Sequence, residues 1–200
     1  MSNAARIIII LILTQICWAE THGFPGPNTL GPFRIDRDAA IKTLFDDLGT
    51  PVSTNADAFC YKSSDGKSFL VLSRMTEVYG RDVAGSATLS AFPNCINEPV
   101  TVAKVDLAQW TAGDSIGLGS TAESVLREYG KPSREDRIEG AKYRWIIHGD
   151  RDPTGRYTQK DRPEIGDRVL VYKGAPNDLR IAEFGIRAGK VAWIFLSRNE

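Results

Sequence analysis

The sequence predicts an α+β fold of two tandem units, each a helical segment followed by an about four-stranded antiparallel sheet. Two helical patterns end at a glycine with a proline two residues later, Gly49-Thr50-Pro51 and Gly130-Lys131-Pro132. The two stops lie 81 residues apart, and apolar residues coincide at this offset. Alternating or apolar runs with turn residues between them follow each stop, which is typical of antiparallel strands.

The composition is that of an ordinary globular protein. Hydrophobic residues make up 42% and charged residues 25% of the sequence. Its length of 200 residues is enough for one domain or two small ones. The 25 basic and 25 acidic residues give zero net charge and are interleaved along the chain. A nucleic-acid binder would show a basic stripe, so we expect no nucleic-acid or acidic-membrane partner.

The first 19 residues, 1–19, are typical of a secretory signal peptide. Arg6 supplies the positive charge, Ile7 to Leu13 form the apolar core, and cleavage is expected after Ala19. The run is too short to span a bilayer core of about 30 Å. We therefore expect a periplasmic or secreted protein with no membrane span after cleavage. The alternatives are a buried strand and lipidation of Cys17, although lipidation signals need a small residue where Ile16 stands.

The mature chain divides into a leader and two units. Residues 20–32 are rich in glycine and proline and are expected to form a flexible leader. Repeat 1 covers 33–107 and repeat 2 covers 108–200, with residues 108–115 joining them. The helical stripes that predict the two helices are, in order, Ala40, Ile41, Leu44, Phe45 and Leu48, then Ala122, Val125, Leu126 and Tyr129.

Capping and strand signals complete each unit. Ser120 and Glu123 form a capping box for the second helix, and Asp36 or Asp38 can cap the first. The expected strands are 57–62, 68–75, 86–92 and 99–107, then 142–147, 168–173, 179–188 and 190–198. Between two strands of repeat 2 lies a long polar loop, 149–166, where repeat 1 has only a short turn. Long loops in compact domains are commonly functional or disordered.

Two cysteines remain after signal cleavage, Cys60 and Cys95. An even count in an oxidising compartment predicts a disulfide between them. It would close a loop of about 36 residues, which the chain-entropy model values at roughly 4 kcal/mol. The alternative is two separate buried thiols. No Cys-x-x-Cys pair is present for redox catalysis.

Catalytic and cofactor signals are weak. His148 is the one plausible imidazole base, and no Gly-x-Ser-x-Gly elbow supplies it with a nucleophile. The run GDSIGLGS lacks the lysine of a phosphate loop. Asp150, Asp152 and Asp161 follow part of a calcium-loop spacing, but the final glutamate and the flanking helices are missing. We expect no enzyme, no cofactor and no metal, and leave calcium as an alternative for this loop.

The helix-stop motifs carry a resemblance to a known fold. Ile116-Gly117-Leu118-Gly119, Val125 and Tyr129-Gly130-Lys131-Pro132, with the weaker copy from Ile35 to Pro51, resemble the β-lactamase inhibitor protein fold. They are also similar to the small lipoprotein subunit of the outer-membrane β-barrel assembly machinery, which matches one unit only. The inhibitor resemblance covers both units and implies a concave sheet surface that binds a protein. Ile16 before Cys17 departs from the lipoprotein pattern.

The expected function is that of an exported, non-enzymatic protein-binding module, inhibitor-like or an envelope assembly factor. Aromatic residues and arginine are enriched at interfaces, so the candidate binding residues are Tyr143, Trp145, Arg156, Tyr157 and Trp193. Alternation places Val191, Trp193 and Phe195 on one strand face, and both tryptophans can equally be core residues. The alternative function is a small-ligand-binding protein or hydrolase-like enzyme that uses the open sheet face and loop 149–166 near His148.

Overall fold

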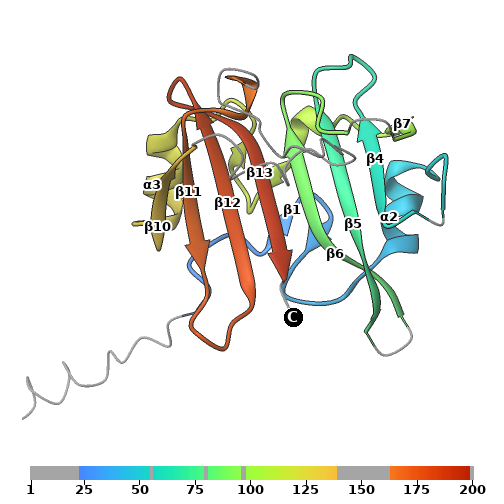
Figure 1. Cartoon of the computed structure of the whole chain (residues 1–200), viewed down its shortest axis with the longest axis horizontal. Coiled ribbons are helices and arrows are strands. Elements are labelled where there is room, and N and C mark those ends of the chain that lie inside the picture. Colours follow the sequence, from blue (N-terminus) through green and yellow to red (C-terminus); the bar gives the residue numbers. More distant parts are fainter. Residues whose placement is uncertain (1–22, 55, 79–80, 96–97, 139–162, 199–200) are drawn as a thin grey trace, which may run out of the picture.

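One large sheet dominates the mixed α+β fold of the computed structural model, which describes residues 23–54, 56–78, 81–95, 98–138 and 163–198 (Figure 1). In that part of the chain the sheet has nine strands, in the order β10-β11-β12-β13-β6-β5-β4-β7, with β3 also paired to β6. The pairs are antiparallel except β4–β7, which is parallel. The bounds are β3 Ala39–Ala40, β4 Ala58–Lys62, β5 Phe69–Val78, β6 Arg81–Ser90, β7 Val100–Val102, β10 Arg134–Arg137, β11 Arg168–Lys173, β12 Arg180–Arg187 and β13 Lys190–Arg198.

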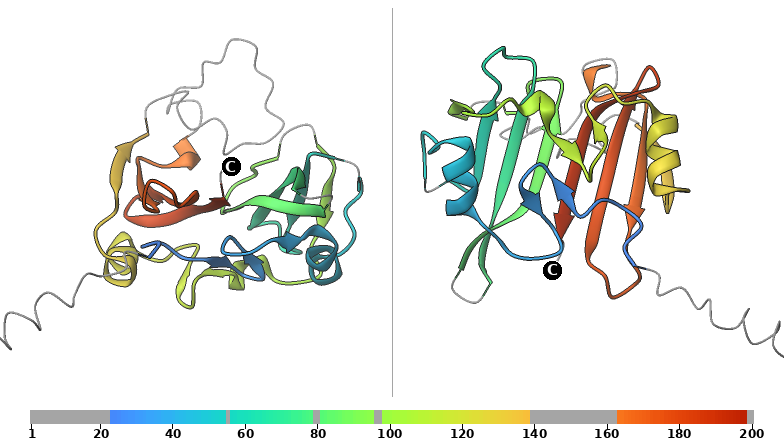
Figure 2. Two further views of the ribbon diagram at one scale, coloured as in Figure 1. Left: turned by 90° about the horizontal axis from the view of Figure 1, so that it is seen from below. Right: turned by 180° about the vertical axis from the view of Figure 1, so that it is seen from behind.

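A second layer covers one face of the large sheet. It contains the helices α2 (Ile41–Leu48) and α3 (Ala122–Tyr129) and, between them, a four-stranded sheet (Figure 2). The order of this small sheet is β2-β1-β8-β9, and its strands are β1 Thr29–Leu30, β2 Phe33–Arg34, β8 Thr111–Ala112 and β9 Ile116–Gly117. A short 3-10 helix, η1 (Leu107–Gln109), precedes β8, and another, η3 (Pro163–Ile165), precedes β11. The main apolar core lies between the two layers.

Both predicted helix stops are confirmed. Gly49 closes α2 with a φ of 97°, and Gly130 closes α3 with a φ of 73°. Positive φ favours glycine because other residues carry a Cβ that clashes there. The two amide groups donate to the carbonyls of Phe45 and Leu126, so each glycine satisfies a free carbonyl of the last turn.

The helix starts differ from the prediction. The N-cap of α3 is Thr121, whose hydroxyl accepts a hydrogen bond from the amide of Ser124. The Ser120 hydroxyl instead accepts from the amide of Gly117 and closes the preceding turn. At the start of α2, Ala40 is the N-cap and makes no side-chain capping bond, whereas Asp36 is bound by Arg34 and Asp38 pairs with Arg198. The expected capping box and aspartate cap are therefore corrected.

Part of the expected flexible leader is built into the fold. Leu30 is fully buried in β1, and the Arg180 guanidinium binds the segment from two sides. It donates to Asn28 Oδ1 at 2.8 Å and lies 5.0 Å from the centre of the Phe24 ring. Glycine and proline in this stretch shape a tight path over the core, so the expectation of a loose leader is wrong for the described residues from 23 onward.

A β-bulge changes the predicted faces of β13. Gly185 pairs with Trp193 and Ile186 pairs with Val191, which leaves Ala192 as an extra residue. Val191 consequently packs in the main core with Ile194, whereas Trp193 points to the opposite face of the sheet. The alternation that placed Val191 and Trp193 on one face is thus interrupted between them.

The face of the large sheet away from the helices, which we call the second face, has its own apolar clusters. Phe92, Ile165 and Trp193 belong to one of them, over β11–β13. The predicted disulfide between Cys60 and Cys95 lies in the other, with a Cα–Cα distance of 6.2 Å. The disulfide ties the segment that follows β6 to strand β4. Among the described residues, no helix is long and apolar enough to cross a membrane.

Candidate functional site

Most of the predicted contact residues lie outside the described part of the chain. This group contains the predicted binding residues Tyr143, Trp145, Arg156 and Tyr157, the histidine His148, and the calcium candidates Asp150, Asp152 and Asp161. Within the described residues, no group of three or more His, Cys, Asp or Glu side chains is placed to hold a metal ion. The described residues provide a different candidate site, on the second face of the large sheet.

Trp193 is a core residue. Its side chain is fully buried, and its indole N–H donates to the carbonyl of Ile165 at 2.8 Å. The ring lies directly over Gly185, where a Cβ atom would collide with it. The side chain therefore has no surface to offer a partner. This finding corrects the predicted contact role of Trp193 and supports the core alternative.

A row of three serines crosses the centre of the second face. Ser73 of β5, Ser86 of β6 and Ser197 of β13 are direct neighbours across adjacent strands. Met75 and Gly85 lie beside them, with Arg74 and Arg198 at the edge, and together these seven residues line a hollow of about 520 Å³. We call it the serine hollow. Its residues come from β5, β6 and β13, and the β6–β13 pair (Figure 1) joins the first half of the chain, up to residue 107, to the second half, from residue 108.

Two arginines contribute to the lining of the serine hollow, but their charged groups are engaged elsewhere. Arg74 is held firmly: Nη2 donates to the Thr54 carbonyl at 2.6 Å, and the guanidinium lies 5.0 Å from the ring centre of Phe59, a residue of the main core. Its Nε is 2.9 Å from Asp82 Oδ1, an ion pair by distance without hydrogen-bond geometry. Arg198 is half exposed, pairs loosely with Asp38 at 3.6 Å, and also lines a hollow with Asp36, Asp178 and Arg180. The Arg74 guanidinium is thus directed to the opposite face of the sheet, and hydroxyl groups are the main polar groups of the serine hollow.

The described lining of this hollow offers hydroxyl and apolar groups. A serine hydroxyl becomes a nucleophile only when a base within hydrogen-bond reach takes its proton. The titratable groups among the seven described lining residues are arginines, which cannot serve as that base. The hydroxyls can form hydrogen bonds, and the methionine can make adaptable apolar contacts.

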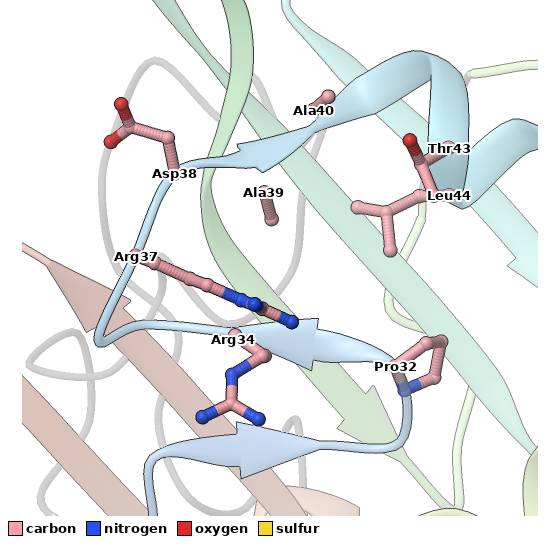
Figure 3. Close-up of a pocket in the computed structure, with 8 residues that line it drawn as sticks. All are labelled: Pro32, Arg34, Arg37, Asp38, Ala39, Ala40, Thr43 and Leu44. Carbon is pink, nitrogen blue, oxygen red and sulfur yellow. The ribbon is translucent and has the colours of Figure 1, made fainter.

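A second hollow, on the layer with the helices, is smaller. It has a volume of about 270 Å³ and lies between the β1–β2 hairpin and the start of α2 (Figure 3). Figure 3 shows the Arg37 side chain reaching across it toward Pro32, while the Asp38 carboxylate turns away. Arg34, at its edge, is engaged by Asp36 through two hydrogen bonds of 2.6 and 2.9 Å. Much of the positive charge here is therefore already neutralised.

Arginine–aspartate pairs fasten the neighbouring chain segments. Arg180 donates to both carboxylate oxygens of Asp178, at 2.8 and 2.6 Å. Hydrogen bonds from Arg180 lower the pKa of Asp178, and those from Arg34 lower the pKa of Asp36. Asp36, Asp178 and Arg180 also line a hollow of about 380 Å³. Because their charges are satisfied by one another, these residues act mainly in holding the N-terminal segment to the β11–β12 hairpin.

The serine row is not visible in the sequence. Ser73 and Ser197 follow apolar runs, and Ser86 begins the expected strand 86–92, so each looks like an ordinary outward strand position. Alternation assigns side chains to a face within one strand, whereas neighbours across strands depend on the pairing register. The β6–β13 pairing, which joins distant parts of the chain, brings Ser86 and Ser197 together.

Comparisons with known proteins add little to this description. No protein-family model matches the sequence, and no curated protein matches it at a significant level. The structure is similar to the crystal structure of a DUF4309 family protein (YjgB) from Bacillus subtilis subsp. subtilis str. 168, with a TM-score of 0.41 and 12% sequence identity. The alignment covers 83% of this chain and 82% of that chain. A similarity at this level carries no argument about function.

Proposed function

We propose that this protein is an exported, non-enzymatic protein-binding module whose two halves are copies of one unit and present a single sheet face to a partner. The observation that carries the proposal is the serine hollow, which lies on the second face where the two halves join. A binding surface that both halves form together requires that they belong to one continuous sheet, as the β6–β13 pairing provides. The predicted signal peptide and the disulfide support export.

The helices support the duplication. α2 and α3 are both eight residues long, and their bounds coincide at the offset of 81 residues. After each helix, a tyrosine of the large sheet donates its hydroxyl to the carbonyl of the terminal glycine. Tyr61 binds Gly49 at 2.9 Å, and Tyr172 binds Gly130 at 3.0 Å. The same bond thus fixes each helix to its sheet.

The two central hairpins also correspond. The β5–β6 register shifts after Ser73 and skips Gly85, and the β12–β13 register shifts after Gly185 and skips Ala192. Bulges are specific features of a strand pair, so their equivalent placement supports descent from one unit. The inner six strands of the large sheet, β11-β12-β13-β6-β5-β4, are symmetric about β6 and β13, as is the small sheet about β1 and β8, whereas the edge strands β10 and β7 do not correspond.

Paired hydrogen bonds join the halves in the small sheet. The Gly31 amide donates to the Thr111 carbonyl, and the Gly113 amide donates to the Thr29 carbonyl, both at 3.0 Å. The two bonds are reciprocal, as an approximate twofold axis between β1 and β8 requires. Tandem units that resemble the inhibitor protein fold would present the sheet face away from the helices, which is the face that carries the serine hollow.

Two baits with matched substitutions test the proposed function. Ser86→Arg places a bulky cation in the hollow, and Leu126→Arg places the same side chain on the exposed side of α3. We expect the unmodified protein and the Leu126→Arg bait to retain the same protein from an extract of exported proteins, and Ser86→Arg to lose it. Equal retention by both variants, or none by the unmodified protein, would contradict the proposal. Tyr157→Ala and Arg156→Ala baits test the loop residues in the same assay.

A further inference from the structure

The Trp193 side chain is buried on the second face, over strands β11–β13. Across the strands, Trp193 lies in a row with Gly185 of β12, Ser90 of β6 and Phe69 of β5. Gly185 leaves room for the indole ring, because a Cβ there would collide with it. The ring is fully buried, and its N–H donates to the Ile165 carbonyl. In this row the Trp193 indole ring fills the space above Gly185.

The proposed duplication gives this row a counterpart. When the two hairpins are aligned at their bulges, Gly185 is equivalent to Ser73 and Trp193 to Ser86. The skipped residue Ala192 is then equivalent to Gly85. The counterpart row contains Ser73, Ser86, Ser197 and Ile181, which are again direct neighbours across strands. A small serine therefore stands where the other half has tryptophan, and this position lies in the serine hollow.

We propose that the serine hollow receives an aromatic side chain, of the indole type, from the partner protein. The space is available at Ser86, and about 520 Å³ accommodates such a ring. The hydroxyls of Ser73 and Ser86 can accept a hydrogen bond from the ring N–H, as the Ile165 carbonyl does for Trp193. Buried tryptophan anchors are frequent centres of binding energy at protein interfaces. This inference rests on the proposed function and names the chemistry of the partner.

The border of the hollow sets no charge preference for the neighbours of that ring. The Arg74 guanidinium lies beside Phe59 of the main core, on the opposite face of the sheet. Arg198 contacts Asp38 at 3.6 Å and also lines the hollow of Asp178 and Arg180. The occupant is therefore specified by its aromatic side chain.

Two short peptides test this assignment directly. The probes are acetylated, amidated Glu-Trp-Glu and Glu-Leu-Glu, which differ only in the central side chain, titrated into the ¹⁵N-labelled protein expressed from its full-length sequence. We expect Glu-Trp-Glu to shift the amide resonances of Ser73, Gly85 and Ser86, and to bind about tenfold more tightly than Glu-Leu-Glu. Equal shifts with both peptides, or shifts elsewhere only, would overturn the inference.

A filled hollow provides the matched variant. Ser86→Trp should occupy the space itself and remove the peptide-induced shifts, while Ser115→Trp, in the exposed β8–β9 turn, should leave them unchanged. Retained binding by folded Ser86→Trp contradicts the assignment. If Ser86→Trp does not fold, the shift map of the unmodified protein still decides the matter.

The two proposals fail in different ways. Loss of a captured partner with Ser86→Arg, together with no response to Glu-Trp-Glu, would keep the binding function and reject the aromatic occupant. A specific response to Glu-Trp-Glu at Ser73 and Ser86 with no captured partner would keep the aromatic pocket and reject the proposed function. Failure of both assays would reject both.

Discussion

Single residues decide how closely the strands and helices of this protein approach. Gly185 is the clearest example, because the Trp193 indole occupies the space where a Cβ atom would stand. Other strand positions accept a side chain, whereas this one requires its absence. The residue opposite Trp193 must therefore be glycine, and a mutation of Gly185 measures how tightly the ring is packed.

Gly185→Ala should therefore destabilise the protein. Overpacking of a buried site costs typically about 1–3 kcal/mol, and this ring is fully buried. Urea unfolding of the variant measures the loss. Combining it with Trp193→Phe should cost less than the sum of the two single changes, because the smaller ring relieves the collision. Additive losses, or a neutral Gly185→Ala, would show that the ring does not lie over the glycine.

Two tyrosines provide a second prediction. Tyr172→Phe and Tyr61→Phe each remove a hydrogen bond to a helix-terminal glycine, and each should cost about 1 kcal/mol. Burial raises the pKa of Tyr172 to about 12 and also raises that of Tyr61. The unfolded chain then loses its protons first, so stability falls as the pH rises above about 10. Each variant should show a weaker decline in alkaline urea titrations, and an unchanged decline would contradict the burial.

At the level of helices and strands, the disulfide makes the next prediction. Cys60 lies in β4 and Cys95 follows β6, so the bond holds the segment after β6 against β4 on the second face. Replacing both residues with alanine should lower stability by about 2–4 kcal/mol. Urea unfolding of this variant, and of the reduced unmodified protein, should give midpoints lowered to a similar extent. Stability unaffected by either treatment would show that the bond adds nothing to the fold.

Local signals predicted the two helices and the long strands. The stops at Gly49 and Gly130 and the strand runs such as 168–173 depend on neighbouring residues along the chain. The expected strand 99–107 is instead the short parallel β7 followed by η1, and Leu126 of the predicted apolar stripe is exposed. The cap at Thr121 was missed by one position, because Ser120 and Thr121 offer the same hydroxyl and the Ser120 hydroxyl binds the Gly117 amide. Element type follows from sequence periodicity, and exact boundaries depend on packing.

Features that depend on distant pairing escaped prediction. The bulge at Ala192 turned Trp193 away from Val191, and no local pattern marks it. Residues near Leu30 looked like a leader because glycine and proline suit loops, yet they pair with β8 from much later in the chain. The serine hollow likewise exists only in the β6–β13 register. The candidate site was therefore beyond what strand alternation alone could predict.

At the scale of the whole molecule, the two halves of the chain share one sheet and one core. The pairing of β6 with β13 makes one sheet, and a single core cluster contains residues from both halves, such as Leu44 and Val125. Neither half can expose its edge strand without breaking hydrogen bonds and uncovering apolar surface. The segments predicted as two separate units thus share one continuous core.

Thermal unfolding should accordingly occur in one cooperative step. Calorimetry of the oxidised protein is expected to give a single transition whose calorimetric and van't Hoff enthalpies agree. Substitutions in either half, such as Leu44→Ala or Val125→Ala, should shift that one transition. Two separable transitions, each responding to one substitution, would show that the halves fold independently.

Photo-crosslinking in an extract of exported proteins tests the proposed binding surface most directly. A photoreactive phenylalanine analogue is placed at Ser86 in the serine hollow or, as a control, at Leu126 on α3. We predict a crosslinked protein from Ser86 alone, competed by the unmodified protein and joined through a segment that contains an aromatic residue. A crosslink from Leu126 and none from Ser86 would place the binding surface on the helices and contradict the proposed function.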